Sequence, residues 1–213
     1  NADDTKIKLK IDHTYRVAAL CERIAKAAGM CAYDVELAWL SGMLHDVGRF
    51  EQIKRYNTFS DADSVDHAKF GADLLFKDGL ISTFLNGMVK CTGYKPGALE
   101  NRYSSDGVFL YDRLNKSDME MLELAIRCHN MYRIPQGLNS REQAFCNVLR
   151  DADKVDIFKV NIDTPLEEIY NTTTEELMKS DITDEVLEAF DEEHCILKAI
   201  RRTPADTVIG HVS

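Results

Sequence analysis

The chain has 213 residues, of which 45% are hydrophobic and 29% charged, a mixture typical of soluble globular domains. No apolar run reaches the roughly 18–20 residues of a membrane-spanning helix, so we expect no membrane segment. The net charge is −10, yet residues 164–194 hold 11 acidic residues against one Lys and the remainder is neutral; without a basic stripe, duplex nucleic acid is disfavoured as a ligand, whereas a small anion is not.

The first predicted helix runs from Asp12, as its N-cap, to Ala28, and Gly29 ends it. Its apolar stripe includes Val17, and His13 lies four residues earlier on the same face. The second predicted helix covers residues 34–47 and stops at Gly48. On this helix His45 lies on the apolar face and Asp46 is rotated by about 100°, so the two side chains reach one site only near a helix end.

The polar stretch 49–66, RFEQIKRYNTFSDADSVD, is predicted to be a loop. Helices are then expected over 66–76, with His67 in the first turn, and over 81–91. Residues 92–117 carry turn residues and scattered aromatics, which predicts an excursion with a short strand pair around 108–111.

Asp118 is expected to cap a helix that carries His129, and Ser140 with Gln143 predicts a capping box that opens a long helix carrying Asp153. Two further helices are expected, over 165–170 or 175–179 and over 183–197, with His211 in a frayed tail. The pattern predicts an all-α fold: a helical domain over 1–163, and an acidic helical extension over 164–213 that packs on it.

The six cysteines form no CxxC pair, and most lie among apolar residues of predicted helices. Reduced cysteine behaves there as a small hydrophobe. Together with the polar start NADDTKIKLK, which does not read as a signal peptide, this usage predicts a cytoplasmic protein without a disulfide framework.

Four histidines and two aspartates form an ordered series along the predicted helices: His13, His45, Asp46, His67, His129 and Asp153. One histidine on an apolar helix face is more often a core residue than a ligand. It is harder to explain four inward histidines, one from each of four separate helices, as core residues. Because histidine and carboxylate hold divalent metals, and bundle cores are a usual place for such sites, the series predicts a metal site inside a helical bundle.

Four segments resemble the motifs of the HD superfamily of metal-dependent phosphohydrolases: DHTYRVAALCERIA, LSGMLHDVGRF, SVDHAKFGADLL and LRDADKVDIF. The resemblance spans residues 13–158 and implies an HD-domain helical bundle with extra C-terminal helices. It implies that one metal is held by His13, His45, Asp46 and Asp153. His67 and His129 match the members that hold two metals, with Asp46 as the bridging carboxylate and a water between the ions as the nucleophile.

The histidine-rich ligand set favours one or two Fe or Mn ions, with Zn, Co or Ni as alternatives. Arg16, Arg49 and Lys154 are candidate phosphate-binding residues, with a solvated or supporting role as the alternative for each. Asp66 either caps its helix, orients a ligand or acts as a general acid.

The resemblance implies a hydrolase that cleaves a phosphomonoester or phosphodiester of a small molecule, with a nucleotide favoured. Two alternatives stay open: an HD-type oxygenase that holds two irons on the same ligand set, and a non-catalytic, metal-stabilised binding module. The sequence specifies neither the substrate nor the oligomeric state.

Overall fold

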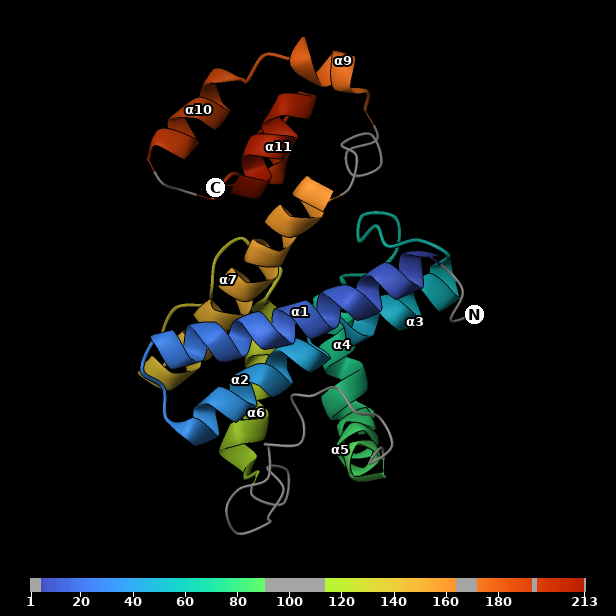
Figure 1. Cartoon of the computed structure of the whole chain (residues 1–213), viewed down its shortest axis with the longest axis vertical. Coiled ribbons are helices and arrows are strands. Elements are labelled where there is room, and N and C mark those ends of the chain that lie inside the picture. The colour runs from blue at the N-terminus through green and yellow to red at the C-terminus, as the bar shows by residue number, and fades with distance from the viewer. Residues whose placement is uncertain (1–4, 91–113, 164–171, 193–194, 213) are drawn as a thin grey trace. The chain divides into compact units, whose positions relative to one another are not determined.

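The computed structural model describes residues 5–90, 114–163, 172–192 and 195–212, and within these ranges it contains helices and no strand (Figure 1). The predicted all-α fold is therefore confirmed. The chain divides into two compact units, residues 1–152 and 153–213, which we describe separately. The expected strand pair at 108–111 and the expected helix at 165–170 lie outside the described residues, and the packing of the acidic extension on the helical domain stays a prediction.

Helices α1 (Thr5–Ala27) and α2 (Ala32–Leu44) pack along each other in the first unit (Figure 1). A Cβ on Gly42 would lie 2.6 Å from the Cα of Ala18, so this contact requires glycine. Gly29 ends α1 in the left-handed region, at φ 73°, as predicted. The predicted start at Asp12 was wrong, because the helix-forming residues of TKIKLKI continue α1 back to Thr5 and leave Asp12 exposed inside it.

Helix α3 (Val47–Tyr56) follows α2 after a turn at His45 and Asp46. Most of α3 lies in the stretch 49–66, which we predicted to be a loop. That prediction was wrong because a polar residue occupies the buried face of α3. Gln52 is fully buried, and its amide group donates to Asp61, to the hydroxyl of Ser64 and to the carbonyl of Val65. A helix that buries a hydrogen-bonded glutamine shows little hydrophobic periodicity.

Gly48 lies inside α3 and does not stop a helix, contrary to the prediction. It faces Gly71 of α4 (His67–Ala72), whose backbone nitrogen would lie 2.8 Å from a Cβ on Gly48. The close backbone contact brings the first turn of α3 against the first turn of α4. Helix α4 continues as the π-helix η1 (Asp73–Lys77), and α5 (Leu80–Lys90) forms within one residue of the helix predicted over 81–91.

Helices α6 (Lys116–Cys128) and α7 (Ser140–Asp163) supply much of the remaining core of the first unit. The predicted caps were shifted by a few residues. Asn115 caps α6, with Asp118 as the reciprocal partner of its capping box, and Asn139 rather than Ser140 accepts the first amide groups of α7. Both helices nevertheless form where the sequence placed them. The fully buried core side chains include Leu37, Leu44, Leu75, Leu122, Ile126, Phe145 and Leu149.

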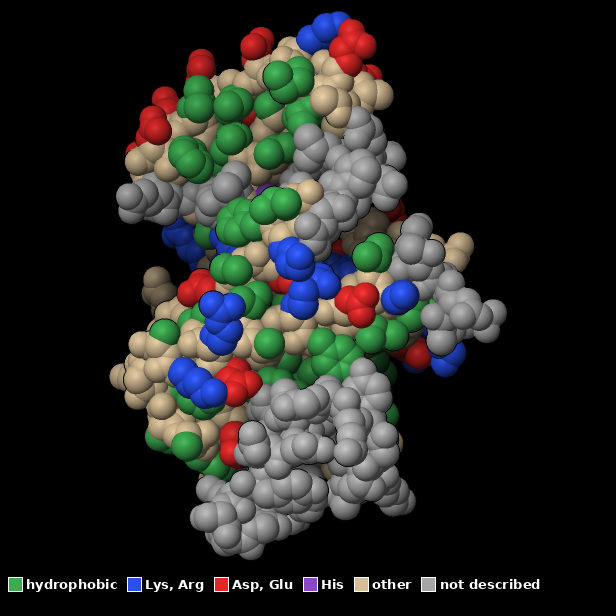
Figure 2. Space-filling model, viewed as in Figure 1, with side chains coloured by type: hydrophobic (Ala, Val, Ile, Leu, Met, Phe, Trp, Pro, Cys, Tyr) green, Lys and Arg blue, Asp and Glu red, His purple; other side chains and the backbone are tan. Residues whose placement is uncertain are grey.

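The second unit contains, besides the end of α7, helices α9 (Thr174–Met178), α10 (Asp184–Asp191), η3 (Lys198–Ile200) and α11 (Pro204–Val212). The acidic side chains of α9 and α10 are exposed, as expected of a solvated helical surface (Figure 2). Asp206 is fully buried and accepts from the backbone amides of Thr183, Arg202 and Thr203, which ties α10 to α11. His211 lies within α11, so the predicted frayed tail was wrong.

Within the parts of the chain that the structure describes, no helix has the length and apolar character needed to cross a bilayer. The cysteines in these parts are all free thiols: Cys21, Cys31, Cys128, Cys146 and Cys195.

We predict that Gly48→Ala destabilises the protein by about 3 kcal/mol, because the added methyl group meets backbone atoms that cannot move aside. Gly79→Ala is the matched control. Nothing lies within 4 Å of its Cβ position, and only its positive φ of 78° opposes the change, at about 1–2 kcal/mol. Urea unfolding of the metal-free proteins measures both. Equal loss of stability in the two variants would contradict the close α3–α4 contact.

Candidate metal centre

The carboxylate of Asp46 lies at the centre of a histidine cluster. Asp46 occupies the turn between α2 and α3 and is 3% exposed. Four helices contribute one histidine each: His13 from α1, His45 from the end of α2, His67 from the start of α4 and His129 from the end of α6. All four are at most 7% exposed, and hardly any histidine surface is visible on the face drawn in Figure 2.

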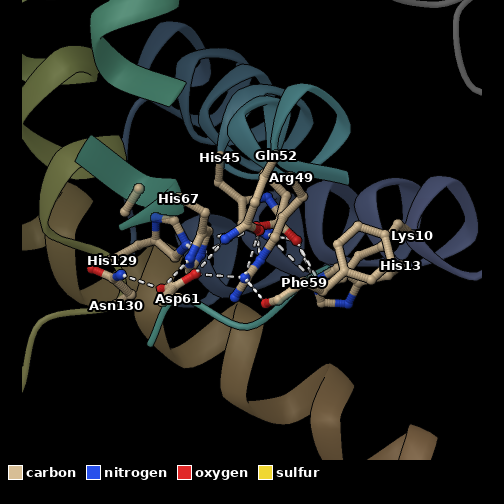
Figure 3. Close-up of polar contacts among 12 residues, drawn as sticks. Lys10, His13, His45, Arg49, Gln52, Phe59, Asp61, His67, His129 and Asn130 are labelled. Atoms are coloured by element: carbon tan, nitrogen blue, oxygen red, sulfur yellow. Dashed lines mark hydrogen bonds and ion pairs between the residues drawn. The ribbon is translucent and has the colours of Figure 1, made fainter. Parts of the chain in front are cut away.

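The two oxygens of Asp46 face different pairs of histidines. Oδ2 lies 3.7 Å from Nε2 of both His13 and His45, and these two nitrogens are 3.3 Å apart. We call these three atoms the first trio. Oδ1 lies 3.4 Å from Nε2 of His67 and 3.9 Å from Nε2 of His129, and these nitrogens are 3.1 Å apart. These atoms form the second trio. Figure 3 shows His67 and His129 on one side of Arg49 and His13 on the other.

The imidazole rings of His45, His67 and His129 form hydrogen bonds through Nδ1, so that Nε2, the nitrogen in each trio, can bind a metal. Nδ1 of His45 donates to the carbonyl of Gly42, and Nδ1 of His129 donates to the carbonyl of Ile126, both at 2.7 Å. A carbonyl only accepts, so Nδ1 holds the proton and Nε2 of the neutral ring carries a lone pair. His67 likewise places Nδ1 2.7 Å from a carboxylate oxygen of Asp61.

Two facing lone pairs repel, so the contact between Nε2 of His67 and Nε2 of His129 favours a cation between them. The distances agree with this reading. For separations of 3.3, 3.7 and 3.7 Å in the first trio, the point equidistant from the three atoms lies about 2.1 Å from each. For 3.1, 3.4 and 3.9 Å in the second trio it lies about 2.0 Å from each. These are ordinary metal–nitrogen and metal–oxygen bond lengths, so both trios fit a divalent ion.

The groups around Asp46 keep it ionised despite its burial. Burial alone raises the pKa of the Asp46 carboxyl, but the Lys10 ammonium and the histidines outweigh this and hold the pKa well below its usual range. The Nζ atom of Lys10 lies 2.8 Å from Oδ2. Burial lowers the pKa of His67, which favours the neutral, metal-binding ring, although the hydrogen bond to Asp61 and the charge of Asp46 act in the opposite direction.

Asp61 and Arg49 form a supporting layer behind the second trio. Oδ1 of Asp61 accepts from Nη1 of Arg49 at 2.6 Å, while its Oδ2 binds His67. Nη1 of Arg49 also donates to Gln52 and to the carbonyl of Phe59, and its Nε lies 3.8 Å from Oδ1 of Asp46. Arg49 therefore connects both carboxylates, which favours the supporting role over a free phosphate ligand.

Sequence reasoning did not identify Lys10, Gln52, Asp61 or Asn130. Lys10 lies three residues before His13, but we had predicted that the helix begins only at Asp12. Asp61 lies six residues before His67 in the string DADSVDH, and nothing distinguishes it there from its acidic neighbours. Asn130 follows His129, and its amide donates to Asp66 at 2.9 Å.

Asp66 is the N-cap of α4 and accepts from the amides of Ala68 and Lys69. Burial alone raises the pKa of Asp66, but the hydrogen bonds from Asn130 and Lys69 lower it below its usual range. An ionised carboxyl is a poor proton donor, so these contacts favour the capping role, and general-acid chemistry at Asp66 stays a prediction.

The remaining candidates lie on α1 and α7. Arg16 is half-buried, one turn beyond His13. Asp153 directly follows the buried Ala152 on the uninterrupted helix α7 and continues the face of Leu149. Lys154 places its Nζ atom 3.5 Å from the sulfur of Cys195. A substrate role for Arg16 and Lys154 and a ligand role for Asp153 stay predictions.

We predict that Asp61→Asn weakens metal binding at the second trio by about 10–100-fold, because His67 loses the carboxylate that fixes its ring and its proton. The first trio keeps its affinity. Asp63→Asn changes an exposed residue of the same segment and serves as the control. Titration with Mn²⁺ followed by calorimetry resolves the two sites. Unchanged binding at both sites in Asp61→Asn would remove Asp61 from the supporting layer.

Comparison with known families gives one match. The family model described as the HD domain matches residues 11–161, which contain every ligand candidate named above. Searches of curated proteins and of solved structures gave no match. The matched range covers most of the chain and includes the helices that carry both trios. The chain therefore belongs to the HD domain family.

Proposed function

We propose that the protein is a metal-dependent phosphohydrolase that cleaves a phosphomonoester or phosphodiester of a small molecule, with a nucleotide as the favoured class. The observation that carries the proposal is the position of Asp46, whose two oxygens each face a separate pair of histidine nitrogens. Membership of the HD domain family supports the hydrolytic chemistry. Unbonded thiols are compatible with a cytoplasmic location, which we propose with it.

Two divalent ions in such a site supply a nucleophilic water at neutral pH and neutralise charge on a phosphoryl group. His13, His45 and Asp46 would hold the first ion, with Asp153 as a further ligand. His67, His129 and the second oxygen of Asp46 would hold the other.

The chain's own residues fix this geometry. The carbonyls of Gly42 and Ile126 orient two rings through Nδ1, and Asp61 orients His67. The burial of the histidines excludes bulk water from the ligand atoms, and this strengthens every electrostatic interaction there. Arg16 and Lys154 are proposed to bind the substrate phosphate, because Arg and Lys suit phosphate oxygens.

The number of bound metals tests the site. We expect purified protein reconstituted with Mn²⁺ to hold two equivalents by mass spectrometry, and His67→Ala and His129→Ala to hold about one. The matched control is His211→Ala, a histidine of α11 outside the trios, which should keep two. One equivalent in the wild type, unaffected by either change, would confine the site to the first trio.

Turnover tests the chemistry. We expect Mn²⁺-dependent release of phosphate from a panel of nucleotides and other phosphate esters. Asp46→Asn should lower the rate by at least about 1,000-fold, because one oxygen of the shared carboxylate is lost from both ion sites. Oxygen uptake that depends on iron, with no phosphate release, would overturn the proposal in favour of an oxygenase. Stable metal binding without turnover on the whole panel would favour a binding module.

A further inference from the structure

Two cations lie beside the Asp46 carboxylate, and they differ in how firmly they are held. Arg49 approaches Oδ1, and its Nη1 also donates to Asp61, to Gln52 and to the carbonyl of Phe59. Lys10 approaches Oδ2 from α1, and the hydrogen bond described for its ammonium is the one to Asp46, at 2.8 Å. Arg49 is thus fixed by several acceptors, whereas one hydrogen bond to the described residues holds the unbranched, flexible side chain of Lys10.

Lys10 is also a partly exposed side chain, unlike the histidines of the site. Of the groups described within 4.0 Å of the Asp46 carboxylate, the Lys10 side chain is the most exposed, at 27%, followed by Arg49 at 16%. The histidine side chains of both trios are at most 9% exposed. The Lys10 side chain therefore runs from solvent to Oδ2, the oxygen of the first trio.

The ammonium and an ion in the first trio compete for the same oxygen. The ion would take Oδ2, the oxygen that now accepts from Lys10. The double positive charge of a divalent ion would also lie within a few ångströms of the ammonium and would repel it. The four-carbon stem allows the ammonium to turn outward, toward solvent. An anionic group that binds to the ion from solvent arrives from that direction.

We propose that Lys10 is an exchangeable counter-charge of the metal site. It neutralises Asp46 in the metal-free protein, and in the metal-loaded protein it binds the anionic group of the ligand, a phosphoryl oxygen. This inference deepens the proposed function and rests on it for the identity of the anion. It assigns to Lys10 the substrate contact for which Arg49 is too firmly held.

The test compares Lys10→Met with Lys8→Met, which removes an exposed lysine of the same helix. Calorimetry measures the Kd for Mn²⁺ and then, on the Mn²⁺-loaded protein, the Kd for inorganic phosphate. In Lys10→Met we expect Mn²⁺ to bind about tenfold more tightly at one site, because the competing charge is gone, and phosphate to bind about tenfold more weakly. Lys10→Arg should restore phosphate binding in part, and Lys8→Met should match the wild type.

The inference is overturned if Lys10→Met binds Mn²⁺ no more tightly than the wild type, or if its phosphate affinity is unchanged. Circular dichroism of the metal-free and metal-loaded variants confirms that each is folded. Neither binding measurement depends on turnover. Hydrolysis without an effect of Lys10 on binding therefore contradicts this inference alone, whereas Lys10-dependent phosphate binding without hydrolysis contradicts the proposed function alone.

Discussion

The burial of one ionised carboxylate is the constraint on which the first unit depends. Asp46 is almost fully buried, and an isolated charge in that position would be very unfavourable. Four histidines, Lys10 and Arg49 surround it, and Lys10, His45, His67 and His129 hold its pKa low. These groups come from five helices, so the carboxylate is satisfied only when α1, α2, α3, α4 and α6 are assembled. The negative charge of Asp46, which suits the site to metal binding, therefore also favours one arrangement of the helices.

The assembly depends in turn on two close backbone contacts. Gly42 lets α1 approach α2, which brings His13 beside His45, and Gly48 with Gly71 lets α3 approach α4, which brings His67 toward Asp46. Side chains at these positions would push the histidines apart by more than the few tenths of an ångström that metal coordination tolerates. Small residues next to the ligands are therefore part of the metal-site geometry, although they coordinate nothing.

Local patterns predicted most of the helices and the histidines of the cluster. The apolar periodicity of α1, α2 and α6 points His13, His45 and His129 inward, and His67 was expected in the first turn of its helix. The same patterns failed at α3, whose buried face carries Gln52, and at Gly48, which serves packing instead of helix termination. Lys10 could not be predicted because its partner is distant in the sequence, since it meets Asp46 across 36 residues. Asp61 lies only six residues from His67, but nothing in the sequence distinguishes it from the acidic residues beside it. Such pairs become apparent only in three dimensions.

The central claim is that Asp46 joins two metal ions into one site. The most direct test is electron paramagnetic resonance of the Mn²⁺-loaded protein, together with X-ray absorption at the manganese edge. We predict a magnetically coupled pair with a metal–metal separation of about 3.5–4 Å, and loss of the coupling in Asp46→Asn. Two uncoupled ions in the wild type, or coupling that persists in Asp46→Asn, would contradict the account.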